Sequence, residues 1–168
     1  MTGAATQGPA SESGVASWEV RPARPEDVGA VAAAVASLLE ELGAEPPARG
    51  AIESEALAHI DDPSLGIVLV AEADADLVGV LTASWARAIQ AAGRLLTIEV
   101  LWTRREWRDR GVGAALVDAL AAAAAAEGAG KVEVGLPRES FPALRATERF
   151  YLVNGFERLG PRMRRAVS

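Results

Sequence analysis

The chain has 168 residues, of which 50% are hydrophobic and 24% are charged, with a formal net charge of −6 and no cysteine. This composition is typical of an ordinary globular protein, and the lack of cysteine excludes disulfides, thiolate metal sites and an acyl-cysteine intermediate. The acidic balance argues against nucleic acid as a main partner, because phosphate neutralisation dominates such binding, and it suits a cationic amine.

Composition also predicts how the chain is divided. Residues 1–17 are rich in Gly, Ala, Ser, Thr and Pro without an apolar period, so we expect a disordered leader there and one domain over residues 18–168. No apolar run approaches the ~20 residues that cross a bilayer, and the start of the chain lacks the basic and apolar regions of a secretory signal. We therefore expect a cytoplasmic protein that does not bind membranes.

Hydrophobic periodicity and turn residues predict alternating strands and helices. In chain order we expect a strand at 18–21, helices at 25–42 and 51–61, strands at 66–72, 77–85 and 95–103, a helix at 111–127, a strand at 131–136, a helix at 141–153, and closing strands at 156–159 and 162–165. The turn at 74–76 makes the strands on either side of it a hairpin. The segment 95–136 is a strand–helix–strand unit with short loops, which predicts two neighbouring parallel strands. The predicted fold class is an α/β layered domain on one mixed sheet.

An arginine-rich stretch at residues 104–113 joins the strand at 95–103 to the helix that follows. Four arginines there stand against two acids, in a chain that is acidic as a whole. Gly111 and Gly113 let the backbone come close to a ligand, and the first unpaired N–H groups of the helix point out of its start. Donors and positive charge together at a helix N-terminus predict an anion site, most simply for a phosphate.

The spacing Arg108-x-x-Gly111-x-Gly113-Ala114 resembles the Arg/Gln-x-x-Gly-x-Gly/Ala signature of the GNAT acyltransferase superfamily, which binds the pyrophosphate of acetyl-coenzyme A (acetyl-CoA). The dinucleotide fingerprint Gly-x-Gly-x-x-Gly is absent, and so is the Lys-Ser/Thr ending of a P-loop. The two commonest alternative phosphate-binding motifs are therefore disfavoured.

A second stretch also resembles this family, whose final helix commonly ends in Phe/Leu-Tyr, three residues, then Gly-Phe. Here Phe150-Tyr151 is followed after three residues by Gly155-Phe156, and a helix and a strand separate the two signatures, as in the family. The resemblance implies a GNAT-like fold, which is a mixed, mostly antiparallel sheet with a central parallel pair of strands, flanked by helices. It also implies an N-acetyltransferase that uses acetyl-CoA as co-substrate, needs no metal, and lets a primary amine of a small molecule attack directly in a ternary complex.

Direct attack requires a neutral amine. An acceptor with a pKa of ~10.4 is neutral in about one molecule in 10³ at pH 7, a deficit of ~4.6 kcal/mol that a base or a desolvating pocket must offset. Glu99 is the candidate base, directly or through water, because the period of two places it on the strand face of Leu101 and Thr103. The alternative is that Glu99 pairs with a neighbouring arginine.

Tyr151 matches the residue that in many family members donates to the departing thiolate. Ordinary pKa values of ~10 for tyrosine and ~8.5 for a thiol make full proton transfer uphill by about 2 kcal/mol, so we expect a hydrogen bond to the developing thiolate instead. The alternative is a packed aromatic ring whose hydroxyl has a backbone partner.

The resemblance also implies the coenzyme-binding residues. The main chain around Leu101, Trp102 and Thr103 would contact the pantetheine arm, where the two parallel strands diverge. The pyrophosphate would be bound, largely by main-chain N–H groups, by Arg108, Asp109, Arg110, Gly111, Val112, Gly113 and Ala114.

Four positions depart from the family pattern. Thr103 replaces the usual small hydrophobic residue and Arg105 a common proline. Asp109 places a negative side chain where glycine or a basic residue is more usual, which should weaken phosphate binding unless it points away. Leu144 stands where many members have an asparagine that contacts the coenzyme. These departures affect individual contacts rather than the fold.

The sequence leaves several interpretations of single residues and of the function open. His59, the only histidine, is a candidate base or a surface or capping residue, since it has no partner at a recognisable spacing. The fold also suits a non-catalytic acyl-CoA-binding sensor or scaffold module, or an acetyltransferase for protein N-termini or lysines. Family members are often dimers, so a homodimer is an expectation of the same kind.

Overall fold

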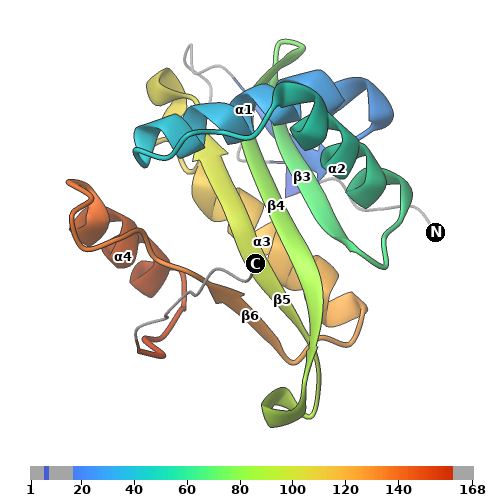
Figure 1. Ribbon diagram of the computed structural model, residues 1–168, viewed down its shortest axis with the longest axis vertical. Coiled ribbons are helices and arrows are strands. Elements are labelled where there is room, and N and C mark those ends of the chain that lie inside the picture. Colours follow the sequence, from blue (N-terminus) through green and yellow to red (C-terminus); the bar gives the residue numbers. More distant parts are fainter. Residues whose placement is uncertain (1–5, 8–16, 161–168) are drawn as a thin grey trace.

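A computed structural model describes residues 6–7 and 17–160, which form a single sheet with helices on both faces (Figure 1). Its strands are β1 (Thr6–Gln7), β2 (Glu19–Pro22), β3 (Gly66–Ala73), β4 (Asp76–Ala88), β5 (Gly93–Thr103) and β6 (Lys131–Val134). They lie in chain order, and each neighbouring pair is antiparallel except β5 and β6, which are parallel. The predicted mixed, mostly antiparallel sheet with one parallel pair is confirmed.

Helices cover the sheet from both sides. They are α1 (Val28–Glu41), which follows the short 3-10 helix η1 (Pro25–Asp27), then α2 (Arg49–Asp61), α3 (Val112–Ala126) and α4 (Leu144–Val153). Figure 1 shows α1 and α2 in front of the sheet and α3 behind it. Within the described ranges, none of these helices has the length and apolar character that crossing a membrane requires.

Two apolar clusters pack against the sheet. The larger one joins the strands to α3 and includes Leu81, Leu96 and Leu116, which are fully buried. The smaller one joins the strands to α1 through Val31 and Ala34. Strand β3 contributes to both clusters, since successive side chains of a strand point to opposite faces. This explains why β3 is apolar at nearly every position rather than at every second one.

A charged network fixes the start of α1. Arg21 on β2 donates to Asp27 (Nη1 to Oδ2, 2.7 Å) and to Glu72 on β3 (Nε to Oε2, 2.7 Å). Asp27 also accepts the main-chain N–H of Arg24 at 2.7 Å. The hydrogen bonds from Arg21 hold the pKa of Asp27 below its ordinary value, and the same contacts raise the pKa of Arg21. Because Asp27 is buried and paired, α1 begins at a fixed point on the sheet.

Strand β5 contains a bulge at Glu99. Its pairing with β4 runs up to Ile98 and resumes at Val100, so that Glu99 has no partner on β4. Ile98 and Leu101 pack into the same cluster although they are three positions apart. The period of two that placed Glu99 on the face of Leu101 and Thr103 therefore does not run through this point, and that argument fails.

The start of α3 is pressed against the middle of the sheet. A Cβ on Gly79 of β4 would lie 2.8 Å from Cγ1 of Val112, which is the first residue of α3, and 3.0 Å from Leu116. Only glycine allows this approach without displacing the helix. The contact fixes the height at which α3 begins relative to the end of β5.

Other sequence predictions differ from the structure at the ends of elements. Strands β4 and β5 continue to Ala88 and from Gly93, so the expected connection at 86–93 is mostly a hairpin arm that ends in the 3-10 helix η2 (Ile89–Ala91). Arg94 lies over the ring of Trp85 at 3.9 Å from its centroid, a cation–π contact that stabilises the arm.

The C-terminal part differs more. Helix α4 begins at Leu144 rather than at 141, and residues 156–159 form no strand, so the first closing strand was predicted wrongly. The second, at 162–165, lies outside the described residues. In the expected leader, Thr6–Gln7 pair with β2 as β1, and most of the remaining residues of that segment are not described.

Candidate active site

The first turn of α3 presents free main-chain donors. Among the described residues, no hydrogen bond uses the N–H groups of Val112, Gly113 or Ala114, and Ala115 is the first in the helix to donate, to the carbonyl of Gly111 at 3.0 Å. Three such N–H groups at the positive end of a fifteen-residue helix are the donors that an anion site of this kind needs. That they bind an anion stays a prediction.

The loop before α3 turns sharply. After β5 ends at Thr103, the chain passes through the 3-10 helix η3 (Arg105–Trp107), and both Asp109 (φ +60°) and Gly111 (φ +83°) adopt left-handed conformations. Glycine adopts this conformation without cost, whereas aspartate does so with some strain. The exposed Asp109 has no ion pair within the described chain.

The four arginines of this stretch have different partners. Arg104 donates to the carbonyl of Leu77 at 2.9 Å and lies 3.7 Å from Asp76, so it is tied to the β3–β4 turn. Arg108 donates to the carbonyl of Thr103 and to the carboxylate of Glu41 at the end of α1. The exposed Arg105 and Arg110 remain, the latter over the ring of Trp107. The charge available to an anion is therefore smaller than the sequence count implies.

The two sequence signatures meet in space. A Cβ on Gly113 would lie 3.3 Å from Cζ of Phe150 on α4 and 3.8 Å from Oγ1 of Thr103. The first turn of α3, the end of β5 and the aromatic residues of α4 therefore surround one point. This convergence could not be measured from the sequence.

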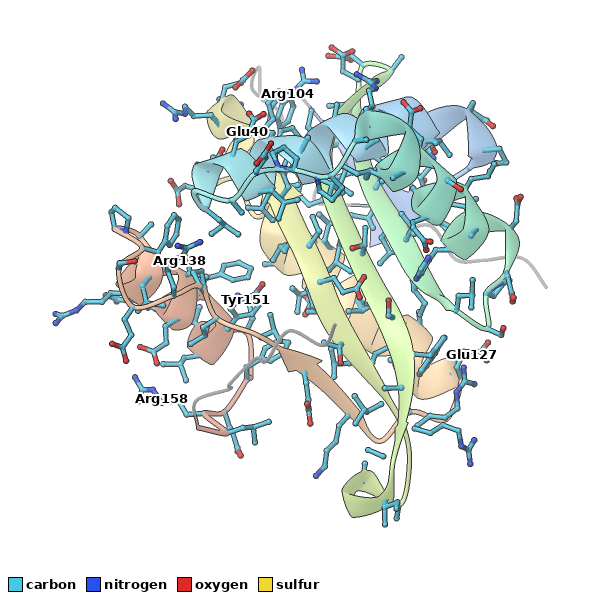
Figure 2. The ribbon with its side chains drawn as sticks, viewed as in Figure 1. Glu40, Arg104, Glu127, Arg138, Tyr151 and Arg158 are labelled. Carbon is cyan, nitrogen blue, oxygen red and sulfur yellow. The ribbon has the colours of Figure 1, made fainter. Side chains whose placement is uncertain are left out.

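Tyr151 is buried beside that point. It is 7% exposed, and its ring contacts the rings of Phe150 and Phe156 edge-on, with centroids 5.2 and 5.1 Å apart. Figure 2 shows it on the side of α4 that faces the sheet. Its hydroxyl has no hydrogen-bond partner within the described chain, and burial raises the pKa of Tyr151 to about 12. The hydroxyl therefore keeps its proton at neutral pH and is available as a donor.

The parallel strands pair only over part of their length. Pairing of β5 with β6 ends at Ile98, opposite Val134, while β5 continues to Thr103 beside β4 alone. Main-chain groups of β5 beyond Ile98 on the β6 side are thus left without a strand partner. Leu101 and Thr103 lie in this opening, as the resemblance implied.

Glu99 lies at the bulge at the start of this opening. Its side chain is exposed and makes no ion pair or hydrogen bond within the described chain, so the alternative of an arginine partner finds no support. The carboxylate is accessible to solvent and to a ligand.

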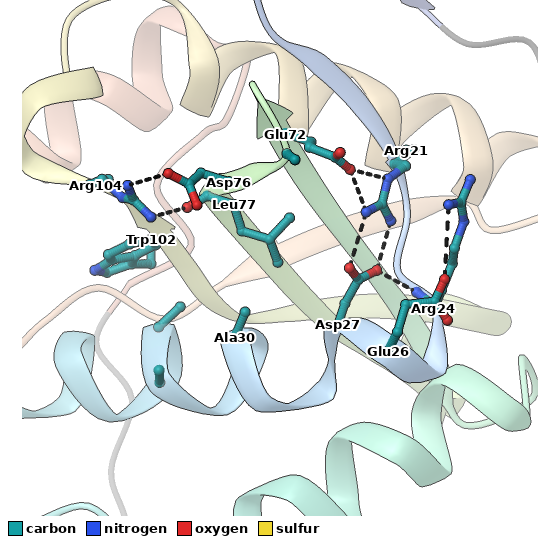
Figure 3. A pocket seen from close by; sticks show the side chains of 13 residues that line it. Arg21, Arg24, Glu26, Asp27, Ala30, Glu72, Asp76, Leu77, Trp102 and Arg104 are labelled. Atoms are coloured by element: carbon teal, nitrogen blue, oxygen red, sulfur yellow. Dashed lines mark hydrogen bonds and ion pairs between the residues drawn. The ribbon is translucent and has the colours of Figure 1, made fainter.

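The side chain of Trp102 lies away from the opening between β5 and β6. It lines a pocket of about 540 Å³ between the start of α1 and the ends of β3, β4 and β5, together with Arg104 and the Arg21 network (Figure 3). Its Nε1 is buried and has no partner in the described residues. Only the main chain of Trp102 can therefore contribute to the opening between β5 and β6.

His59 has partners that sequence spacing did not reveal. Its Nδ1 lies 2.9 Å from the carbonyl of Glu55 on the same helix, and its Nε2 lies 3.2 Å from Oγ of Ser84 on β4. A carbonyl only accepts, so neutral His59 carries its proton on Nδ1 and accepts the hydroxyl proton of Ser84 on Nε2. These contacts give His59 a structural role between α2 and β4.

The sequence profile of the acetyltransferase (GNAT) family matches residues 34–156, which include both signatures. The chain belongs to this GNAT family. Among the curated protein sequences, none matches this GNAT protein. Membership of this family identifies the chain as an acyltransferase, and it does not specify the acceptor.

Solved structures share the fold of this GNAT protein. An aminoglycoside N-acetyltransferase, AAC(6')-Iy, in complex with CoA has a TM-score of 0.77 at 14% identity, over 94% of this chain and 99% of that chain. A predicted acetyltransferase with acetyl-CoA from Clostridium acetobutylicum gives 0.73 at 15% identity, over 89% and 96%. An aminoglycoside acetyltransferase from an uncultured soil metagenomic sample gives 0.71 at 19% identity, over 90% and 99%. At these identities the likeness confirms the fold.

Proposed function

We propose that this GNAT protein transfers an acetyl group from acetyl-CoA to a primary amine of a small molecule, by direct attack in a ternary complex. The observation that carries the proposal is the set of unpartnered N–H groups at Val112, Gly113 and Ala114, next to the opening between β5 and β6. Two of the similar structures contain CoA or acetyl-CoA, and two are aminoglycoside acetyltransferases, which supports this choice of coenzyme and acceptor.

The chain offers matching contacts for the two parts of the coenzyme. The pyrophosphate would accept from the N–H groups at the start of α3, with Arg105 and Arg110 supplying positive charge nearby. The pantetheine arm would lie in the opening and bond the main chain at Leu101 and Thr103. Gly113 leaves room for this approach, because its missing Cβ would otherwise meet Phe150.

Acetyl-CoA would supply the thioester, and the chain's own residues would manage the protons. A C–N bond forms as the C–S bond breaks, and the acceptor nitrogen loses a proton, which Glu99 takes directly or through water. Tyr151 donates a hydrogen bond to the departing sulfur. With its pKa raised to about 12, giving the proton up to a thiolate of pKa ~8.5 would be uphill by about 5 kcal/mol, so Tyr151 stabilises the thiolate without transferring its proton.

A thiol-release assay tests this function. Purified protein is supplied with acetyl-CoA and a panel of aminoglycosides, polyamines, amino acids and peptides. We expect release of free thiol with at least one small amine, and we expect Glu99→Gln and Tyr151→Phe each to lower kcat by about 10²-fold, the scale of a general base or an oxyanion-type donor. The binding constant for the coenzyme should stay within about twofold, because neither side chain is proposed to bind the pyrophosphate.

The two alternative functions predict different results in the same assay. A non-catalytic acyl-CoA-binding module would bind the coenzyme tightly and release no thiol with any acceptor. An acetyltransferase for protein N-termini or lysines would work on the peptides and ignore the small amines. The first pattern would overturn the proposed acetyl transfer, and the second would replace the proposed acceptor class.

A further inference from the structure

One ion pair joins the end of α1 to the coenzyme loop, defined as residues 104–111. Nη2 of Arg108 lies 2.7 and 2.9 Å from the two carboxylate oxygens of Glu41, which is 67 positions away in the sequence. Nε of the same guanidinium donates to the carbonyl of Thr103 at 3.1 Å. Arg108 therefore ties the last residue of α1 and the last residue of β5 to the loop.

The loop needs such a support because its backbone is strained. Asp109, directly after Arg108, has φ +60°, a conformation that costs free energy for a residue with a Cβ and persists only where the surroundings hold it. On the far side the chain is held by Val112, which packs against Gly79 of β4. On the near side Arg104 ties the first residue of the loop to the β3–β4 turn, and the guanidinium of Arg108, next to Asp109, adds a second support.

The position of helix α1, which carries Glu41, is itself fixed by other contacts. Its start is fixed by Asp27 in the network with Arg21, and its body is buried through Val31 and Ala34. Figure 1 shows α1 crossing the sheet from the β3 side towards the top of β5, where the loop begins. Glu41 at its end thus has a defined position, set by contacts far from the loop.

Two possible roles for the ion pair predict opposite changes in coenzyme affinity when Glu41 is removed. In one, Arg108 is a phosphate ligand that Glu41 holds back, so removing Glu41 would tighten coenzyme binding. In the other, the pair holds the loop in shape, so removing Glu41 would weaken binding. The geometry favours the second, because Nε and Nη2 of Arg108 are directed at Thr103 and Glu41.

We propose that Glu41 is a positioning residue for coenzyme binding: through Arg108 it holds the loop so that the N–H groups of Val112, Gly113 and Ala114 face the pyrophosphate. This inference rests on the proposed function of the site. Glu41 touches neither the coenzyme nor the acceptor in this scheme. Its loss should therefore change coenzyme affinity while leaving kcat at saturating coenzyme and the KM of the acceptor within about twofold.

Calorimetric titration of coenzyme A into the full-length protein tests the proposal. We expect Glu41→Gln to raise the Kd by about 3-fold to 5-fold, the upper part of the range for a partly exposed charged pair. Glu40→Gln is the matched control, because Glu40 is the exposed neighbour on the same helix and has no ion pair within the described chain; its Kd should match the wild type.

Each outcome has a clear meaning. A Glu41→Gln variant that binds coenzyme A as tightly as the wild type, or more tightly, overturns the positioning role and leaves the proposed function standing. Wild-type protein that binds no coenzyme A overturns both. The unfolding midpoint of each variant is measured in parallel; an equal Kd rise in Glu40→Gln and Glu41→Gln would also contradict the proposal, since it would reflect charge alone.

Discussion

At the scale of single residues, the two proposed catalytic side chains lie in opposite environments. Glu99 is exposed at a strand bulge, where a carboxylate can receive a proton from a bound amine. Tyr151 is buried among aromatic rings, where its proton is retained and its hydroxyl can donate a hydrogen bond. Two titratable groups whose environments differ in this way are suited to different steps of one reaction.

The burial of Tyr151 can be measured directly, because it is the only tyrosine in the chain. We expect the ultraviolet absorbance of its phenolate to appear with a midpoint of about 12, above the ordinary value of 10.0. A raised folded pKa favours the protonated form, so the stability of the fold should decline as the pH rises above about 10, where the unfolded chain loses this proton first.

The variant Tyr151→Phe serves as the control for this titration. It should show no phenolate signal and a smaller loss of unfolding free energy between pH 10 and 12. A wild-type midpoint near 10 would mean that the ring is solvated, and the free energy needed to pass its proton to a thiolate would fall to about 2 kcal/mol.

At the scale of elements, the site depends on where α3 begins. Its first turn packs against Gly79 of β4, and its Gly113 packs against Phe150 of α4. The loop before it is held by the ion pair of Arg108 with Glu41. None of these contacts lies within one element, so the shape of the anion site is a property of four elements packed together.

Gly79→Ala tests the contact below α3. The new Cβ would lie 2.8 Å from Val112, whose branched side chain has few alternative rotamers, so the helix must move. We expect a loss of about 1–3 kcal/mol in unfolding free energy, as for other overpacked sites, together with weaker coenzyme binding. Chemical denaturation and calorimetry measure the two effects.

Gly50→Ala is the matched control for that substitution. Gly50 lies in α2 with open space around a new Cβ, so alanine should stabilise the protein by about 0.5–1 kcal/mol through helix propensity and leave coenzyme binding unchanged. Equal stability of the two variants would show that α3 does not press on Gly79.

At the scale of the whole molecule, the sequence predicted what is local. The parallel pair follows from a strand, a helix and a strand joined by short loops, and the anion site follows from Gly111 and Gly113 at a helix start. The bulge at Glu99 does not follow, because an inserted residue leaves the apolar pattern of both half-strands intact. The ion pair between Glu41 and Arg108 spans 67 positions, and nothing in either neighbourhood marks it.

The wrong predictions have physical causes too. Residues 86–93 contain one strand-forming side chain, that of Ile89, yet β4 and β5 continue into this segment because each strand supplies the hydrogen bonds of the other and Arg94 covers Trp85. Residues 156–159 have a strand-like sequence but form no strand in the described structure, which shows that a short apolar pattern is insufficient without a partner strand. Both errors concern pairing, which depends on distant residues.

The central claim is that main-chain N–H groups at the start of α3 bind the pyrophosphate of the coenzyme. The most direct test is a titration of labelled protein with coenzyme A, followed by the NMR shifts of the backbone amides. We predict that the largest saturating shifts fall on Val112, Gly113 and Ala114, with the Trp102 indole N–H on the other side of the sheet nearly unmoved. Saturable binding that leaves those three amides unchanged, or that shifts the Trp102 indole instead, would contradict this account.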